Sequence, residues 1–242
     1  MDGLHEYALR LGDDSLILGQ RLGEWCGHGP MLEVDLSLTN IALDLVGQAT
    51  LFLGVAGDAD RFAFHRDVLD FKNCLLVEQP NGDFAQTIAR QFLFSNWQEL
   101  LFRELAQSRH AALAAIAAKA VKEVAYHARL ANEWVVRLGD GTAESRGRMI
   151  NGLDWMWRFG DELFEVDAVL EPLIASGIAA DVRKFRGEWD QRIARTLGEA
   201  TLEAPKPRRA ARGGRIGHHS EHLGHLLSEM QFLPRAYPGA VW

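Results

Sequence analysis

The chain has 242 residues, of which 48% are apolar and 24% charged, and its formal net charge is −7. This composition is that of a globular protein and excludes a disordered chain. The acidic balance argues against a non-specific nucleic-acid binder, which needs a basic face to displace counterions. Two cysteines, Cys26 and Cys74, cannot form a disulfide framework, and they fit a reducing compartment, most simply the cytoplasm.

The N-terminal region shows no targeting segment. Acidic residues fall inside the first fourteen positions and no apolar core follows them, so we expect no signal peptide. No stretch approaches the ~20 apolar residues that span a bilayer. These features predict a soluble, cytoplasmic protein.

The hydrophobic periodicity is helical nearly throughout. It predicts helices over about 13–27, 33–57, 83–107, 110–138, 143–165, 180–200 and 220–235. Asp13 or Asp14 is expected to cap the first helix, and Asp83 to cap the third. Residues 201–217 carry five basic residues, two prolines and three glycines, which predicts an exposed crossover loop. Long helices joined by short loops predict an all-α bundle, forming one domain over 1–242.

A long-helix bundle raises the question of a di-metal centre. The di-iron carboxylate site needs a Glu-x-x-His pair on each of two helices, because residues three apart share a helix face. No glutamate in this chain is followed by histidine three positions later. The usual di-iron site therefore cannot be assembled from this sequence.

Polar residues nevertheless recur every four positions along three of the predicted helices. They include Glu24 in the first, Asp44 in the second, and Lys119, Glu123 and His127 in the fourth. If these stripes face inward they must pair, because an unpaired buried polar group costs roughly 1–3 kcal/mol. We therefore predict a metal-free polar network where a relative would hold metal. The other interpretation is that one or more stripes is a solvated face.

Two further clusters are candidates for binding. Trp155, Trp157 and Phe159 point to more than one face of the predicted helix 143–165, which indicates an interface with a partner, unless all of them fill one core. His218, His222 and His225 could share one helix face with a spacing compatible with a metal. Polar residues at an exposed helix start explain those histidines more simply.

Several long segments together carry a resemblance. RLGEWCGH, NIALDLVGQA, LLVEQPNGDFA, KEVAYH and EHLG occur in order along essentially the whole chain. They resemble the PaaC family, the ferritin-like structural subunits of the multicomponent phenylacetyl-CoA epoxygenase. The resemblance implies a non-catalytic subunit of an NADPH-dependent monooxygenase that epoxidises phenylacetyl-CoA in aerobic phenylacetate catabolism.

The same resemblance implies the partners and cofactors. The di-iron centre belongs to a homologous catalytic subunit, which this chain would bind and stabilise, and no cofactor belongs to this chain. A small bridging subunit and a reductase with FAD and an iron–sulfur cluster complete the system. The isolated chain could self-associate through the surface that its partner would cover.

Two other hypotheses stay open at this point. One is a ferritin-like di-metal oxidase or oxygenase with a rearranged ligand set: Glu24, Asp44, Glu123 and His127. The other is that the basic loop 201–217 contacts the anionic CoA moiety or an acidic partner surface through Arg208, Arg209 and Arg212.

Overall fold

A computed structural model describes residues 3–206 and 209–240. Those residues contain helices and turns and no strand, so the prediction of an all-α fold is confirmed. The chain forms two compact units. Unit 1 comprises Met1–Pro80 and Gly213–Trp242, and unit 2 comprises Asn81–Arg212. A single domain over 1–242 stays a prediction.

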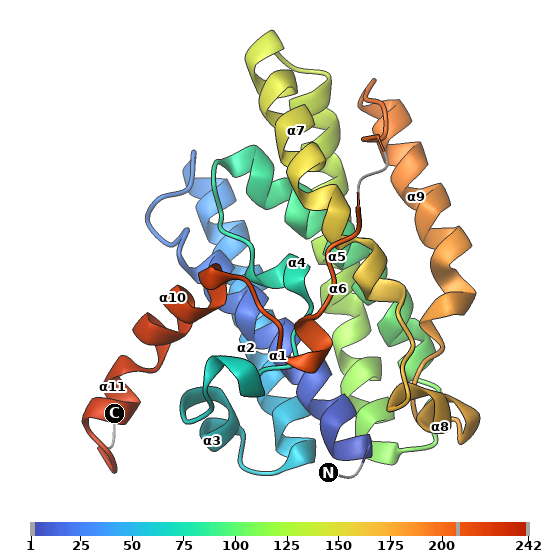
Figure 1. Ribbon diagram of the computed structural model, residues 1–242. Helices are drawn as coiled ribbons and strands as arrows, with labels where there is room; N and C mark the ends of the chain where they lie inside the picture. Colours follow the sequence, from blue (N-terminus) through green and yellow to red (C-terminus); the bar gives the residue numbers. More distant parts are fainter. Residues whose placement is uncertain (1–2, 207–208, 241–242) are drawn as a thin grey trace. The chain divides into compact units, whose positions relative to one another are not determined.

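Unit 1 is built on a hairpin of two long helices, α1 (Gly3–Gly23) and α2 (Leu32–Ala56), which lie side by side. Its shorter elements are α3 (Ala59–Phe64), a 3-10 turn (Val68–Asp70), α4 (Leu75–Glu78), a second 3-10 turn (Gly214–Ile216), α10 (Glu221–Met230) and α11 (Phe232–Ala236). Figure 1 shows α1 and α2 in blue and α10 and α11 in red. The predicted helix 33–57 agrees with α2, whereas the periodicity predicts neither α3 nor α4.

The predicted start of the first helix is wrong. α1 begins ten residues before Asp13, at Gly3, and ends at Gly23 rather than Gly27. Asp13 and Asp14 lie in its middle and are buried. Their carboxylates accept hydrogen bonds from arginines and backbone N–H groups of distant segments, and they do not cap the start of α1.

Unit 2 is built on a second hairpin, α5 (Phe84–Leu105) and α6 (Ala111–Gly139). Its other elements are α7 (Ala143–Met156), 3-10 turns over Trp157–Phe159 and Asp161–Phe164, α8 (Leu170–Ala175), a 3-10 turn over Val182–Phe185, and α9 (Arg186–Glu199). Asp83 caps α5 as predicted, because its Oδ1 accepts a hydrogen bond from the Gln86 N–H at 2.9 Å. Both long helices match their predicted ranges within two residues.

Two predicted helices of unit 2 are too long. The segment 143–165 leaves the α-helix at Met156 and continues in 3-10 turns. The tighter winding places two aromatic rings against Trp189 of α9: the Trp157 ring at 6.4 Å and the Phe164 ring at 5.3 Å, centroid to centroid. The predicted helix 180–200 begins only at Arg186, after a 3-10 turn. Tertiary packing of aromatic rings therefore overrides the helical periodicity here.

Most described residues of the basic loop 201–217 are exposed or half-buried, and two of its arginines form ion pairs. Arg209 is exposed, but Arg212 pairs with Glu165 at 2.7 Å and Arg215 pairs with Asp14 at 2.8 Å. Arg208 lies outside the described residues. The predicted helix 220–235 is divided into α10 and α11 at Gln231.

One described helix is long and apolar enough to cross a membrane, judged by length and composition alone. It is α2, and 44% of its apolar 18-residue stretch is buried. The expectation that no stretch approaches this length is therefore too strict. A core helix of a soluble protein meets the same criteria, and α2 packs one face against α1.

Candidate functional site

The predicted polar residues of unit 1 differ in burial. Glu24 is exposed just beyond the end of α1, where its Oε1 accepts a hydrogen bond from Arg21 Nη1 at 2.8 Å. Asp44 is half-buried on α2, and Gln48, one turn further on, is buried. The position of Glu24 argues against its use in an interior network or as a metal ligand.

The predicted stripe on α6 in unit 2 is graded in burial. Lys119 is exposed, Glu123 is half-buried and His127 is fully buried. Lys119 is therefore a poor candidate for an interior network. Asp44 belongs to unit 1 and Glu123 and His127 to unit 2, so a network that joins them stays a prediction.

The buried polar side chains of α5 bear directly on whether this chain suits a di-iron centre. Apart from Arg90 they are neutral amides and hydroxyls: Thr87, Gln91, Ser95, Asn96 and Gln98. Gln91 Nε2 donates to Ser95 Oγ at 2.5 Å, and Asn96 Nδ2 donates to Asn132 Oδ1 of α6 at 2.8 Å. Iron in such bundles takes carboxylate and imidazole ligands, which these positions do not supply.

The positions of the histidine, cysteine, aspartate and glutamate side chains lead to the same conclusion as the neutral groups of α5. Within residues 3–206 and 209–240, no group of three or more His, Cys, Asp or Glu side chains is placed to hold a metal ion. The described residues do not fit a di-iron centre.

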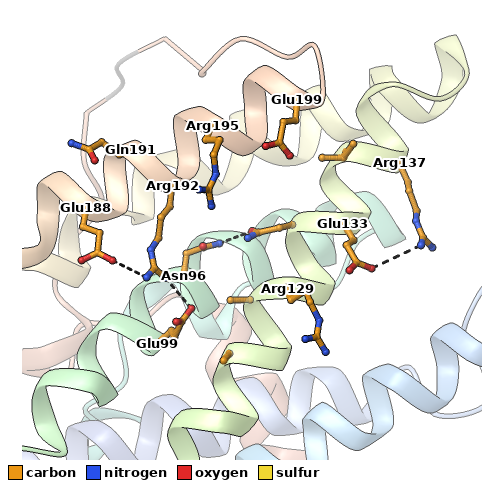
Figure 2. Close-up of a pocket in the computed structure, with 14 residues that line it drawn as sticks. Asn96, Glu99, Arg129, Glu133, Arg137, Glu188, Gln191, Arg192, Arg195 and Glu199 are labelled. Atoms are coloured by element: carbon orange, nitrogen blue, oxygen red, sulfur yellow. Dashed lines mark hydrogen bonds and ion pairs between the residues drawn. The ribbon is translucent and has the colours of Figure 1, made fainter.

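Unit 2 contains an open cleft of about 920 Å³ between α5, α6 and α9. Figure 2 shows side chains of α6 and α9 along its two sides, with Arg192 of α9 reaching toward α5. Arg192 bonds Glu99 of α5 at 2.8 Å and Glu188 of its own helix at 2.7 Å. The charged residues that line the cleft are Glu99, Arg129, Glu133, Arg137, Glu188, Arg192, Arg195 and Glu199.

Those lining charges are balanced, with as many arginines as glutamates. Small-molecule sites are mostly apolar with a few converging polar groups, and anion sites carry an excess of positive charge. The cleft has neither property. Its geometry fits a hydrated groove whose ion pairs attach α9 to the α5–α6 hairpin.

Unit 1 contains a set of buried ion pairs that local sequence patterns do not reveal. Arg66 forms two hydrogen bonds with the carboxylate of Asp13, one of them at 3.0 Å between Nη1 and Oδ2. Arg215 holds Asp14 in the same bidentate way, at 2.9 and 2.8 Å. Burial raises the pKa of Asp13, and the positive charge and hydrogen bonds of Arg66 counter that effect. The two aspartates in α1 thus anchor segments far away in the chain.

His219 is the third member of this set. Its Nδ1 lies 2.7 Å from Oε2 of the buried Glu78, and its Nε2 lies 2.9 Å from the carbonyl oxygen of Phe71. Both partners accept, so the geometry favours the doubly protonated ring. Burial opposes that charge, but Glu78 and the Phe71 carbonyl outweigh burial and raise the pKa of His219.

The segment that carries Arg215 and His219 packs closely against the rest of unit 1. A Cβ atom at Gly214 would lie 2.2 Å from the carbonyl oxygen of Asn73, so no side chain fits there. The backbone N–H of Ser220 donates to Glu78 Oε1 at 2.6 Å. Of the histidines 218, 219, 222 and 225, His219 is therefore an ion-pair partner. Within the described residues the cluster holds no metal-ligand arrangement.

The predicted interface aromatics differ in exposure. Trp155 is 40% exposed, and the guanidinium of Arg158 lies 4.5 Å from the centre of its ring. Trp157 is half-buried against Trp189, and Phe159 is buried. Of these three residues Trp155 offers the largest surface to a partner, and its role in an interface stays a prediction.

The two helix hairpins define a helical protein of the bundle class. Most of the buried polar positions of α5 carry neutral groups. The chain belongs to the family described as Phenylacetic acid catabolic protein, PaaA_PaaC, which matches residues 1–242. It is 50% identical to the PaaC component of the 1,2-phenylacetyl-CoA epoxidase from Escherichia coli (strain K12). That similarity extends over 248 aligned positions and covers 100% of both chains.

Proposed function

We propose that this chain is the PaaC component of a 1,2-phenylacetyl-CoA epoxidase, and that it acts by binding rather than by catalysis. The observation that carries the proposal is the 50% identity over the full length of both chains. Identity at this level without gaps in coverage supports the same place in the same assembly.

The donor set of the helices supports the non-catalytic part of the proposal. Gln91, Ser95 and Asn96 occupy buried positions of α5 with groups that hydrogen-bond one another and α6. The bond between Asn96 and Asn132 joins α5 to α6 and helps to fix the register of the two helices. The chain then serves as a stable surface for the subunit that holds the di-iron centre.

The partners follow from this role. The homologous catalytic oxygenase subunit would bind directly, with a small bridging subunit and an FAD and iron–sulfur reductase in the same complex. We place the assembly in the cytoplasm, in the aerobic degradation of phenylacetate. Iron, flavin and the iron–sulfur cluster belong to the other subunits in this proposal.

Reconstitution tests the proposed function. The catalytic subunit, bridging subunit and reductase of the same organism are purified, and epoxidation of phenylacetyl-CoA with NADPH and oxygen is followed with and without this chain. We expect turnover only when this chain is present, and none from this chain with the reductase alone. Full turnover without it, or turnover by it in the absence of the catalytic subunit, would contradict the proposal.

A further inference from the structure

The helix α2 has two apolar faces, and the described residues of unit 1 cover only one of them. One face, with Leu38, Ile41, Leu45 and Phe52, is buried in unit 1. On the opposite face Leu32, Leu36, Leu43 and Leu51 are exposed by 71%, 55%, 65% and 42%. Helices that are apolar all round are normally covered all round.

The exposed leucines lie on one side of α2, with the exposed polar residues Asn40 and Thr50 between them. At 3.6 residues per turn the four leucines fall within an arc of about 100° along the length of α2. We call this surface the leucine face; it comprises Leu32, Leu36, Leu43, Leu51, Gly47 and Gly54. Leu36 and Leu43 are seven residues apart, as are Gly47 and Gly54. A seven-residue repeat is the spacing with which one long helix packs along another.

The two glycines give the leucine face a shape suited to a helix. A Cβ atom added at Gly47 or at Gly54 would meet no atom of the described chain within 4 Å. Glycine in a helix interior destabilises the helix by roughly 0.5–1 kcal/mol relative to alanine, and here no contact within the described chain explains it. Small residues between leucines allow a second helix to approach closely.

The charges beside the leucine face indicate which kind of helix covers it. The acidic side chains of Glu33 and Asp44 lie along one edge, and residues 32–56 contain no lysine or arginine. A second copy of this chain would bring the same acidic edge and no basic group from its own α2. A different chain with basic side chains beside an apolar stripe complements the charge.

We propose that the leucine face is the docking site for a long helix of the catalytic subunit of the epoxidase, one that carries lysine or arginine along the edge facing Glu33 and Asp44. This proposal rests on the proposed function, since it names the surface through which that function is exercised. The aromatic residues 155–159, predicted as interface candidates, belong to a different unit.

The first experiment measures binding of the full-length chain to the purified catalytic subunit of the same organism by biolayer interferometry. Leu36→Lys/Leu43→Lys is compared with Leu69→Lys, a control at a leucine that is 72% exposed in the same unit but outside the leucine face. We expect the double variant to weaken binding by about 30-fold or more, as the loss of central interface anchors does. The control is expected to bind like the wild type, and both variants to keep the wild-type circular dichroism and melting temperature.

A glycine pair separates docking from folding. Gly47→Leu is expected to raise the melting temperature of the isolated chain, since leucine favours a helix and its Cβ meets no neighbour. It is also expected to weaken binding to the catalytic subunit by about tenfold, because the added side chain fills the space of the partner helix. Gly147→Leu in α7, another helical glycine whose Cβ would meet nothing within 4 Å, should leave binding unchanged.

The outcomes are distinguishable. If the wild-type chain does not bind the catalytic subunit, the proposed function fails and this inference falls with it. If the wild type binds and both leucine-face variants bind equally well, only the docking face is refuted. A dimer of the isolated chain in sedimentation that the double variant abolishes would assign the face to a second copy. Retention on phosphatidylcholine vesicles that the double variant abolishes would assign it to a membrane. Either result overturns the proposal.

Discussion

The two compact units differ in how their buried polar groups are paired. Among the described residues of unit 1, half of the buried polar side chains are charged. Three ion pairs there join positions far apart in the chain: Asp13 with Arg66, Asp14 with Arg215, and Glu78 with His219, separated by 53, 201 and 141 residues. On α5 of unit 2 the buried polar side chains are mostly neutral, and the amide bond between Asn96 and Asn132 joins the two helices of one hairpin.

This difference between the units follows from the kind of segment that each set of polar bonds holds in place. The hairpin of α5 and α6 is held by apolar packing along its length, so weak, directional amide bonds suffice to fix the register of its helices. The segments around Arg66 and Arg215 consist of short helices and 3-10 turns, so no long helix fixes their position. Bidentate ion pairs fix such segments in one position.

The largest expected effect breaks an ion pair of unit 1. Arg66→Met leaves the Asp13 carboxylate buried without its cation, and we expect the free energy of unfolding to fall by about 3–5 kcal/mol. Urea denaturation measures this. Adding Asp13→Leu should restore part of the loss, because an apolar pair of similar volume removes the uncompensated charge.

The control for that variant is an exposed pair. Arg137→Met removes the contact of Arg137 with Glu133, whose N···O distance is 3.9 Å at the surface of α6, and should change stability by no more than about 0.5 kcal/mol. Equal losses in the free energy of unfolding for Arg66→Met and Arg137→Met would show that a buried pair of unit 1 contributes no more to stability than an exposed pair.

A smaller effect is expected from the amides of unit 2. Asn96→Ala removes the donor to Asn132 Oδ1 and to the Phe92 carbonyl, each at 2.8 Å. We expect a loss of about 1–2 kcal/mol in urea denaturation, since the bonds are neutral. A loss as large as that of Arg66→Met would remove the distinction between the two units.

The smallest effect is a pH dependence confined to unit 1. Glu78 and the Phe71 carbonyl raise the pKa of His219, against the opposing effect of burial. A raised pKa in the folded state stabilises the protein fully below the unfolded value of about 6.5, and this contribution is lost as pH rises through the folded pKa. Wild-type stability should therefore decline as the pH rises above about 6.5, measured by urea denaturation.

The matching variant is His219→Gln, which cannot be charged. It should be less stable than the wild type at about pH 6 and should show a flatter profile above about pH 6.5. If wild type and His219→Gln decline in parallel, His219 is not the group that titrates.

The sequence predicts what is local. The bounds of α2, α5 and α6 follow from periodicity and from the Asp83 cap, because residues a few positions apart determine them. The absence of a Glu-x-x-His pair is likewise visible from spacing alone. The acidic pair at 13–14, however, has the local pattern of a helix start, and its partners Arg66 and Arg215 lie too far away in the chain for any local pattern to reveal them.

The candidate site, too, could be predicted only in part from the sequence. The spacing of the stripe on α6 leaves open whether it faces inward or toward solvent, and the structure divides it: His127 is buried and Lys119 is exposed. The leucine face of α2 has a signal in the sequence, because apolar residues occur on every side of that helix. The missing information is which side the rest of the chain covers, and only the packing of α1 on α2 supplies it.

The central claim is that this chain supports the chemistry of a partner and performs none itself. The most direct test is the iron content, measured by inductively coupled plasma mass spectrometry, of the chain purified alone and of its complex with the catalytic subunit after growth in iron-rich medium. We predict iron in the complex in proportion to the catalytic subunit, and far less than one iron per molecule of the isolated chain. Two irons per isolated chain, together with epoxidation of phenylacetyl-CoA when reductase and NADPH are added, would contradict the claim.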